Sequence, residues 1–350
     1  MHNPFGWSLT VATGAAAWVC MLAARAGWNF WSIQKLRLPA GARDPDCMVV
    51  IPARNEEAVI ARAVRSLPHD SVIVVDDHSE DETAEAARKA GAGVLRAPDL
   101  ARGVFGKSNG CLAGARALES RWILFADADT WFEEGFLAAL AGAAELNDLA
   151  FVSVHLDPKA ETPFDRMLLP VARTIQYAAI RPRGDPVTAF RGECILVRRN
   201  GYEFLGGHAT VLNSLTEDTK LAALALRHRL KFGVVRSGGL GHATFREGFA
   251  TARRTGYKLV LLDFATVLIT LSGSFAMAAW PVAAVWAGMA GNWGVTAALI
   301  AIPVAAAAVV WGSGAALLLP VSAYVYAFGL WSGFLRGLRG RRISWKGRAI

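Results

Sequence analysis

The sequence predicts an α/β domain built on a mostly parallel sheet, with membrane-crossing helices at both ends of the chain. Two observations predict this arrangement. Residues 46–258 alternate strand-like apolar runs with segments that repeat apolar residues at helical spacing. Residues 7–24 and 264–335 contain no Asp, Glu, Lys or Arg, and a helix needs about 20 apolar residues to cross a bilayer. We therefore expect a membrane protein with one water-soluble domain.

The N-terminal apolar stretch, within residues 1–30, is predicted to be a retained transmembrane anchor rather than a cleaved signal peptide. In a signal peptide positive charge precedes the apolar run, whereas here Arg25, Lys35 and Arg37 follow it. Positive charge after an anchor places the following domain in the cytoplasm. The sequence therefore predicts a multi-pass protein of the cell inner membrane with a cytoplasmic domain.

The C-terminal apolar region, residues 259–335, is long enough for two or three spans, with a turn at residues 291–294. The tail that follows, residues 336–350, is basic and should also be cytoplasmic. Its cations are Arg336, Arg339, Arg341, Arg342, Lys346 and Arg348. A cytoplasmic tail requires an even number of C-terminal crossings, whereas length suggests three. One segment is then re-entrant or interfacial, and the tail is either a stop-transfer cluster or a site for anionic lipid head groups.

Composition excludes several other classes of function. Hydrophobic residues make up 53% of the chain, which is high for a soluble protein. The four cysteines have no CxxC spacing and so predict neither a zinc site nor a disulfide framework. The net charge of +8 follows largely from the tail, and aromatic and basic residues do not interleave, so no nucleic-acid partner is expected.

Acidic side chains stand at the ends of the predicted strands. "SVIVVDDHS" ends on Asp76 and Asp77, and "RWILFADAD" ends on Asp127 and Asp129. In a parallel sheet the carboxyl ends of the strands share one edge, where ligands of open α/β sheets bind. Clustered carboxylates repel one another, and a bound cation relieves that cost. The pattern therefore predicts a ligand site at this edge.

The Asp127-Ala128-Asp129 spacing suits one hard cation. Alternate residues of an extended chain face the same way, so both carboxylates can point to one ion. Carboxylate oxygens with open water positions favour Mg²⁺ or Mn²⁺ bound through substrate phosphates. The simpler alternative is that aspartate is common in loops after strands.

Five segments in order carry a family resemblance: "VVIPARNEE", "VIVVDDHSEDET", "GKSNGCLAGA", "ILFADADT" and "TEDTKLA". Together they resemble the cytoplasmic catalytic domain of family-2 glycosyltransferases of the GT-A fold, which is Rossmann-like, over residues 46–258. The stretches "GECILVRRNGYEFLGGHATVLNSLTEDTKLA", "FREGFATARRTGYK" and "ISWKGR" narrow the match. They resemble the membrane-anchored branch with carotenoid (diaponeurosporenoate-type) glycosyltransferases, and more distantly the hopanoid-associated ones.

The resemblance implies a role for each matching residue. A nucleotide pocket would be lined by Pro52, Ala53, Asn55 and Glu56, with Asp77, and Asp76 beside it, accepting hydrogen bonds from the uracil or ribose. Lys107 would approach the diphosphate; the simpler alternative is an exposed turn lysine. Asp127 would reach the ribose or the metal, and Asp129 would bind the metal that bridges the diphosphate.

The resemblance also implies that Asp218 is the general base. A positioned carboxylate can take the proton of an acceptor hydroxyl as it attacks the anomeric carbon, and a single displacement inverts that carbon. The alternative for Glu217 and Asp218 is an acidic pair at a helix N-terminus. His208 and His242 are either a substrate-orienting residue and a late metal ligand, respectively, or ordinary structural histidines.

One motif of the processive polysaccharide synthases, Gln-x-x-Arg-Trp, is absent from "FREGFATARRTGYK". Arg246, Arg253 and Arg254 in this stretch either meet the diphosphate or lie at the membrane interface. Residues 163–180 predict a helix with an apolar face, which packs either in a core or on the membrane surface near a lipid acceptor.

The sequence as a whole predicts transfer of a hexose from a nucleotide diphosphate sugar, with UDP-glucose expected, to an isoprenoid or other lipid acceptor with Mg²⁺ or Mn²⁺. A polyprenyl-phosphate sugar synthase or a polysaccharide synthase would use the same donor site. An inactive membrane scaffold that binds a nucleotide sugar is the alternative of another class.

Overall fold

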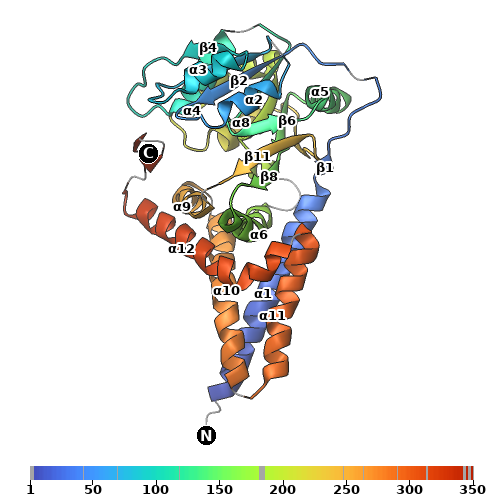
Figure 1. The fold of residues 1–350 in the computed structure, drawn as a ribbon, viewed down its shortest axis with the longest axis vertical. Coiled ribbons are helices and arrows are strands. Elements are labelled where there is room, and N and C mark those ends of the chain that lie inside the picture. Colours follow the sequence, from blue (N-terminus) through green and yellow to red (C-terminus); the bar gives the residue numbers. More distant parts are fainter. Residues whose placement is uncertain are drawn as a thin grey trace. The chain divides into compact units, whose positions relative to one another are not determined.

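The computed structural model divides the chain into two compact units, each described here by itself (Figure 1). The sheet unit comprises Ile33–Lys159 and Asp185–Thr244, and the helical unit comprises Met1–Ser32, Ala160–Gly184 and Phe245–Ile350. The structure describes residues 4–41, 43–68, 70–117, 119–180, 186–246, 248–262, 264–289, 291–312, 314–341, 344–345 and 348–349. Of the basic tail, Arg342 and Lys346 lie outside the described residues.

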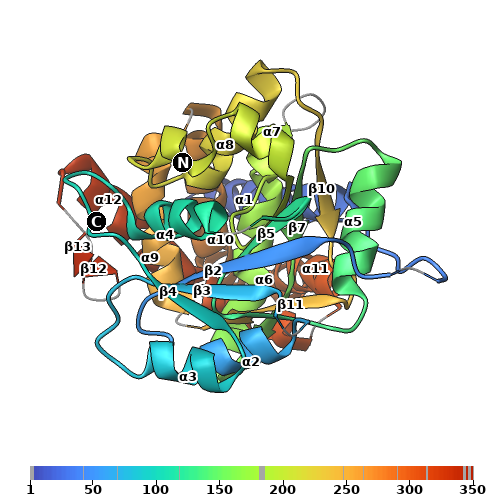
Figure 2. The same ribbon diagram turned by 90° about the horizontal axis from the view of Figure 1, so that it is seen from above.

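The sheet unit is built on an eight-stranded sheet (Figure 2). Its strands in spatial order are β1 (Gln34–Lys35), β10 (Phe232–Arg236), β7 (Phe151–His155), β9 (Cys194–Arg198), β5 (Trp122–Ala126), β2 (Cys47–Ala53), β3 (Val72–Asp76) and β4 (Gly93–Arg96). All neighbours are parallel except β9, which runs antiparallel to both β5 and β7. The predicted mostly parallel α/β sheet is therefore confirmed.

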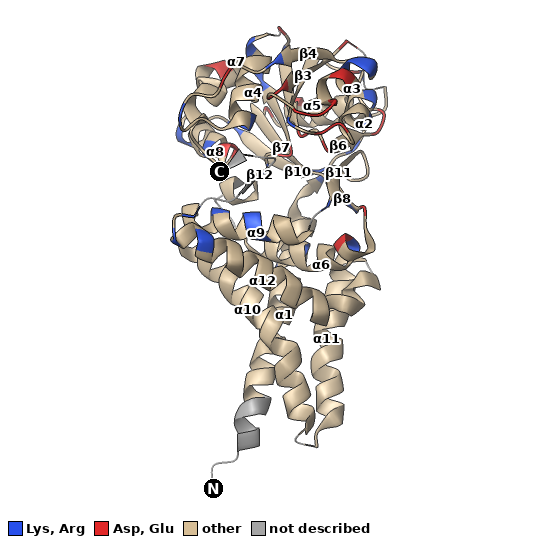
Figure 3. Ribbon diagram, turned by 60° about the vertical axis from the view of Figure 1, so that its left-hand side comes forward, with Lys and Arg blue, Asp and Glu red and all other residues tan. Residues whose placement is uncertain are grey.

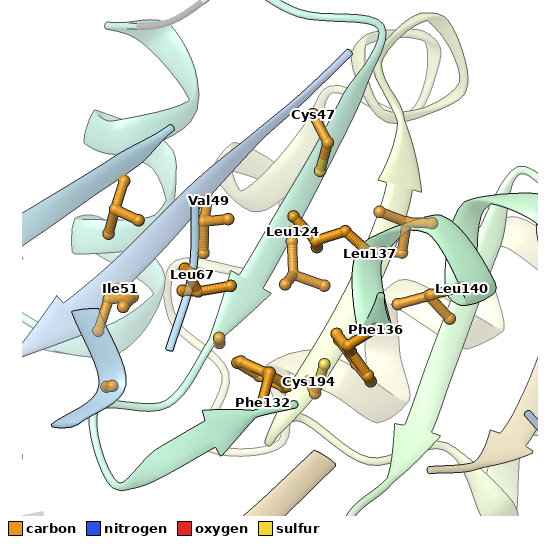
Figure 4. Packing of buried hydrophobic residues seen from close by; sticks show 14 of the residues in the cluster. Cys47, Val49, Ile51, Leu67, Leu124, Phe132, Phe136, Leu137, Leu140 and Cys194 are labelled. Atoms are coloured by element: carbon orange, nitrogen blue, oxygen red, sulfur yellow. The ribbon is translucent and has the colours of Figure 1, made fainter. Parts of the chain in front are cut away.

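Helices cover both faces of this sheet, because the strands carry apolar residues on both faces. One face packs against α2 (Ile60–Arg65), α3 (Thr83–Lys89) and α5 (Phe136–Leu146), and the other against α4 (Gly106–Arg116), α7 (Arg199–Phe204) and α8 (Glu217–Arg227). Along β2, Val49 and Ile51 enter the first core and Val50 the second, as strand alternation requires. Figure 4 shows the first core, where Phe136 and Leu140 of α5 lie near Leu124.

A second, three-stranded sheet continues from the site edge of the eight-stranded sheet. Strand β6 (Thr130–Phe132) begins directly after Asp129 and joins β11 (Gly241–Phe245) and β8 (Asp157–Ala160) in a three-stranded sheet. The backbone N–H of Thr244 donates to the carbonyl oxygen of Asp129 at 3.0 Å. The sheet unit also contains the 3₁₀ turns η1 (Pro186–Ala189) and η2 (Gly207–Val211).

Helix α4 lies unusually close to β2, because its glycines have no side chains. A Cβ atom added to Gly114 would lie 2.4 Å from Val50 Cγ1, and one added to Gly110 would lie 3.1 Å from Pro52 Cβ. Lys107 lies three and seven residues before these glycines and so shares their helix face. The glycines thereby bring Lys107 to the carboxyl end of β2.

The helical unit has two groups of helices. In the first, α1 (Pro4–Ser32), α10 (Phe264–Met289) and α11 (Trp293–Trp311) pack together. In the second, α6 (Pro163–Ala178), α9 (Gly248–Lys258) and α12 (Leu319–Leu338) pack together, next to the short turns η3 (Leu259–Leu261) and η4 (Gly314–Leu318). The tail carries a short hairpin of β12 (Ser344–Trp345) and β13 (Arg348–Ala349).

By length and apolar composition, four described segments qualify as membrane spans: Thr10–Ser32, Phe264–Met289, Trp293–Trp311 and Gly314–Leu338. Figure 3 shows that α10 and α11 carry no charged residue. The predicted apolar helices at both ends of the chain are therefore confirmed. The number that cross the bilayer stays a prediction.

Helix α6 belongs to the helical unit, although it lies within the predicted catalytic segment 46–258. Polar side chains of α1 hold its C-terminus. Arg25 Nε and Nη2 donate to the carbonyl oxygens of Ala178 (2.6 Å) and Ile180 (2.8 Å), and Asn29 Nδ2 donates to that of Tyr177 (2.8 Å). These bonds satisfy carbonyl groups that a helix end leaves open. Arg25 therefore has a structural partner besides its expected effect on membrane orientation.

Candidate active site

The loops that follow β2 and β3 are joined by hydrogen bonds into one rim. Arg54 Nη1 donates to the carbonyl oxygens of Asp77 (2.8 Å) and His78 (2.7 Å). The N–H of Asn55 donates to Ser79 Oγ (3.0 Å), and Asn55 Oδ1 accepts from the N–H of Glu80 (2.9 Å). Asn55 and His78 have φ of 52° and 54°, so both loops turn sharply where the strands end.

This rim contains the residues predicted to line the nucleotide pocket. Pro52 and Ala53 end β2, and the N–H of Asp77 donates to the carbonyl oxygen of Ala53 at 2.8 Å. Glu56 and Asp77 are buried. Asp76 Oδ1 accepts from the N–H of Ser79 at 3.3 Å, so Asp76 helps to shape its own loop. The structure thus brings these residues together, and their contact with a nucleotide stays a prediction.

Lys107 is the centre of a charged cluster at the end of β5. Its Nζ lies 2.6 Å from Asp127 Oδ1 and 3.6 Å from Glu217 Oε1, and it donates to the carbonyl oxygen of Gly192 at 2.9 Å. Burial opposes the charged form of Lys107, but the two carboxylates outweigh burial and hold its pKa well above the usual value. Its side chain is only 25% exposed, which argues against the alternative of an exposed turn lysine.

Asp127 lies in this cluster with unfavourable neighbours. Burial raises its pKa, Lys107 opposes the shift, and the charges of Asp129 and Asp218 add to it. The backbone fixes its position, because its N–H donates to the carbonyl oxygen of Glu193 at 2.9 Å. Asp129, its close neighbour in sequence, and Asp218, from a distant part of the chain, therefore both act electrostatically on Asp127.

Asp218 reaches the cluster because residue 192 is a glycine. A Cβ atom added to Gly192 would lie 3.0 Å from Asp218 Oδ2, so any other residue would crowd this carboxylate. Glu217 and Asp218 also form the first turn of α8, where Asp218 Oδ1 accepts from the N–H of Thr219 at 2.8 Å. Glu217 and Asp218 are therefore an acidic pair at a helix N-terminus, as the alternative predicted. The same position brings Glu217 to Lys107 and Asp218 to Gly192.

Glu193 is a site residue that sequence reasoning missed. Burial raises its pKa to about 7, Arg191 opposes the shift, and Asp127 and Asp129 add to it. It lies just before β9, where Cys194 pairs with Ala126 of β5. The antiparallel insertion of β9 brings Glu193 beside the aspartates, and nothing in the "GECILV" segment announces that pairing.

The cluster fits a divalent cation held jointly with a ligand. Among the described residues, no three His, Cys, Asp or Glu side chains converge to hold an ion by themselves. Asp127 and Asp129 would supply two carboxylates, and phosphate or water oxygens would supply the remaining ligands. The acidic side chains outnumber the nearby cations, Lys107 and Arg191. An added positive charge would therefore relieve the repulsion between the carboxylates.

His208 lies in the core below the cluster. It is 2% exposed, its Nδ1 lies 2.9 Å from Tyr202 Oη, and its ring centre is 4.6 Å from that of Phe125. Burial, and secondarily the charge of Lys107, lowers its pKa to about 3, so the imidazole is neutral. This placement supports a structural role for His208.

The remaining predicted residues lie elsewhere. His242 on β11 has its Nε2 3.1 Å from Glu133 Oε1 and its ring centre 5.2 Å from that of Trp131. Arg246 and Arg254 belong to the helical unit, where Arg254 Nη2 donates to Thr251 Oγ1 at 2.9 Å. Whether either arginine meets a diphosphate stays a prediction.

We expect His208→Gln to flatten the dependence of stability on pH. In the unfolded chain His208 takes up a proton near the ordinary histidine pKa of 6.5, whereas the folded group does so only near 3. The unfolded state therefore binds more protons between these values, and the wild type loses up to about 1.4 kcal/mol per pH unit as pH falls below 6.5. Tryptophan fluorescence during urea unfolding in detergent, at several pH values, would measure this slope.

Val211→Ala is the control for this measurement, because Val211 is buried in the same 3₁₀ turn and does not titrate. It should lower stability at every pH and keep the slope. An unchanged slope in His208→Gln would show that this imidazole protonates in the folded state.

Comparisons with known proteins agree with this architecture. The family model described as "Glycosyl transferase family 2" matches residues 48–206. A mannosyltransferase from Pyrobaculum calidifontis, solved in complex with GDP-Man and Mn²⁺, superposes with a TM-score of 0.58 over 95% of this chain and 98% of its own. The two are 16% identical, so this likeness shows a shared fold.

Two curated relatives are named 4,4'-diaponeurosporenoate glycosyltransferase. The protein from Staphylococcus haemolyticus is 29% identical over 219 residues, which is 58% of this chain and 58% of the relative. The protein from Staphylococcus aureus (strain bovine RF122 / ET3-1) is 42% identical over 89 residues, 24% of each chain. The matched regions thus span less than two thirds of these relatives. The predicted resemblance is confirmed: residues 48–206 match the family-2 glycosyltransferase model, the fold resembles GT-A structures, and the chain resembles the carotenoid glycosyltransferases.

Proposed function

We propose that this chain transfers a hexose from a nucleotide diphosphate sugar to a lipid acceptor at the cytoplasmic face of the membrane, with inversion at the anomeric carbon. The observation that carries the proposal is the cluster of Lys107, Asp127, Glu217 and Asp218 around Gly192, within a family-2 domain. It combines a fixed cation, carboxylates for a metal and a carboxylate for an acceptor proton.

The donor would bind across the rim and the cluster. The nucleoside would lie against Pro52–Glu56 and Asp77, which the hydrogen bonds between the loops hold in place. The diphosphate would lie toward Lys107, whose pKa is held well above its usual value, so the ammonium stays charged. The structural relative binds GDP-Man; for this chain we propose a UDP-sugar, with glucose as the sugar.

Mg²⁺ or Mn²⁺ would be held by Asp129 and Asp127, and it would neutralise charge on the departing diphosphate. The structural relative was solved with Mn²⁺. Asp127 and its neighbour Asp129 fit the ion, because burial and the charge of Asp129 already raise the pKa of Asp127 and so disfavour its negative charge. Lys107 would share the task by donating to phosphate oxygens.

Asp218 would act as the general base. Its Oδ1 accepts from the N–H of Thr219 in the first turn of α8, which orients the carboxylate, while Oδ2 lies against Gly192. An acceptor hydroxyl group would pass its proton to this carboxylate as its oxygen bonds to the anomeric carbon and the diphosphate leaves. Attack from the face opposite the diphosphate inverts the configuration in one step.

A lipid acceptor is proposed from the membrane helices and from the relatives. The curated relatives are named for a carotenoid carboxylic acid, diaponeurosporenoate. The chain has four helices apolar enough to span a membrane, and α6 packs with them. This packing supports the surface-helix alternative for residues 163–180, so that an amphipathic helix lies beside an acceptor dissolved in the bilayer.

Other acceptors define the alternatives. A polyprenyl-phosphate sugar synthase or a polysaccharide synthase would keep the same donor site, and an inactive scaffold would bind the donor without transfer. Because the Gln-x-x-Arg-Trp motif of the processive enzymes is absent, we favour a single transfer to a lipid.

Membranes that contain the chain should transfer radiolabelled glucose from UDP-glucose to a chloroform-soluble product. A carotenoid or related lipid glycoside would absorb visible light or survive mild acid, whereas a polyprenyl-phosphate sugar is hydrolysed by mild acid and a polysaccharide stays at the origin of a thin-layer plate. Label only in polymer or in an acid-labile phosphate would replace our proposal by one of the alternatives. If none of the nucleotide sugars supports transfer, the result would favour the inactive scaffold.

Asp129→Asn should abolish transfer and the metal-dependent part of donor binding, because an amide is a much weaker ligand than a carboxylate. Calorimetry of UDP binding with and without Mn²⁺ would measure the loss. The control is Asp148→Asn, an exposed surface carboxylate with Lys231 at 3.1 Å, which should behave as wild type. Normal turnover by Asp129→Asn would remove this residue from the metal site.

Asp218→Asn should bind donor with nearly wild-type affinity and lose about 10²- to 10⁴-fold in transfer rate, since a positioned general base contributes a factor of that size. Donor affinity and single-turnover transfer would be measured on the same preparation. Glu203→Gln, an exposed acid on α7, is the control. A parallel loss of donor affinity would show that Asp218 binds the donor and is not the base.

A further inference from the structure

Helix α12 has the length and composition of a membrane span, yet its packing is not that of one. Its 20 residues would extend about 30 Å, enough to cross the hydrocarbon core. In Figures 1 and 3 it runs across the bundle of α1, α10 and α11 and lies with α9 and α6. We propose that α12 lies in the plane of the membrane, on its cytoplasmic leaflet; this rests on the proposed membrane placement.

The C-terminal half of α12 runs parallel to α9 with its backbone in close contact. A Cβ atom added to Gly329 would lie 3.0 Å from the carbonyl oxygen of Phe249, and one added to Gly333 would lie 1.9 Å from that of Arg253. A Cβ atom added to Gly337 would lie 3.2 Å from the carbonyl oxygen of Tyr257. Both helices advance by four residues at each contact, so they lie side by side in the same direction.

Helix α9 fixes the depth of this half of α12. It carries Arg253, Arg254 and Lys258, and charged side chains are costly in the hydrocarbon core. It also ends only six residues before the start of α10 at Phe264, so it lies at the cytoplasmic end of that span. A parallel neighbour in backbone contact with α9 along this length lies at the same level.

The start of α12 lies at this level too. Helix α11 ends at Trp311, whose Nε1 donates to Thr174 Oγ1 of α6 at 2.8 Å, and α6 is held at its C-terminus by the cytoplasmic end of α1. Turn η4 then leads directly from α11 into α12 and contacts α6. Both ends of α12 therefore lie on the cytoplasmic side of the membrane, where α10 starts and α11 ends.

Two surfaces of α12 match the boundary between lipid and water. One face consists of small or buried residues that pack on α9 and α6, such as Ala323, Gly329 and Gly333. The other is an exposed apolar stripe at helical spacing: Leu317 at the end of η4, then Val321, Tyr324, Phe328, Leu335 and Leu338. The occupant of this stripe is the acyl region of the leaflet, and the cations of α9 and the exposed Arg336 and Arg339 at the end of α12 meet anionic head groups.

This arrangement resolves the conflict between tail charge and helix count. Three crossings, α1, α10 and α11, place the N-terminus outside and the tail inside. The cations after α1 and those after α12 then lie on the same side, as the positive-inside rule requires. A spanning α12 would place the two groups on opposite sides.

Cysteine labelling separates these topologies. In a Cys20→Ala parent, whose other three cysteines are buried, single cysteines would replace Gly294, Gly314, Arg341 and Ala40. An added Cβ meets nothing within 4 Å at Gly294 and Gly314, and Ala40 and Arg341 are exposed. With a membrane-impermeant maleimide on intact cells, only Gly294→Cys should label. The other three should label in inverted vesicles. Each signal is expressed as a fraction of the labelling of the same variant after denaturation.

Labelling of Gly314→Cys and Arg341→Cys from opposite faces would overturn the proposal, and so would labelling of both from outside. Terminal epitope tags test independently whether the number of membrane crossings is odd or even. Protease added to intact cells should remove an N-terminal tag and spare a C-terminal one, whereas four crossings would place both tags on the same face. Transfer activity is measured separately, so an inactive chain with three crossings would contradict only the proposed function.

Discussion

The ion cluster around Lys107 is the interaction on which the rest of the site depends. Its Nζ lies 2.6 Å from Asp127 and within ion-pair distance of Glu217, and it donates to the backbone at Gly192. Without this ammonium, the partly buried carboxylates at the end of β5 would stand together with little compensation, and both desolvation and mutual repulsion would disfavour their charge. The chain thus holds a concentration of negative charge that one lysine only partly neutralises. The residual negative charge favours a divalent cation, and that cation in turn would attract the diphosphate in the function that we propose.

Glycines decide whether this cluster can assemble. Gly110 and Gly114 let α4 approach β2 closely enough to bring Lys107 to the strand ends, and Gly192 leaves room for Asp218. At Gly192 the missing side chain leaves its space to Asp218, and at Gly110 and Gly114 it lets apolar residues of β2 pack against the helix that carries Lys107. The site therefore depends on the close packing of these glycines as well as on the charged residues that the packing brings together.

The sequence was sufficient for the parts of the fold that local pattern determines. Apolar runs ending on acids predicted β3 and β5, and because parallel strands share an edge, Asp77, Asp127 and Asp129 were expected together. It did not reveal Glu193, since that residue joins the site only through antiparallel pairing of β9 with β5 and β7, which no local signal encodes. It also left His208 open, because only the fold shows the imidazole enclosed by Phe125 and Tyr202.

The helical unit shows the same limit in another form. Composition describes one helix at a time, and by that measure α10, α11 and α12 are equivalent. Depth in a membrane, however, is a property of packed pairs. Helices α10 and α11 pack with α1, which is itself apolar enough to lie in the hydrocarbon core. Helix α12, in contrast, is in backbone contact with the charged α9. A helix that is apolar on its own must lie where its partner can lie, so the cations of α9 decide the position of both.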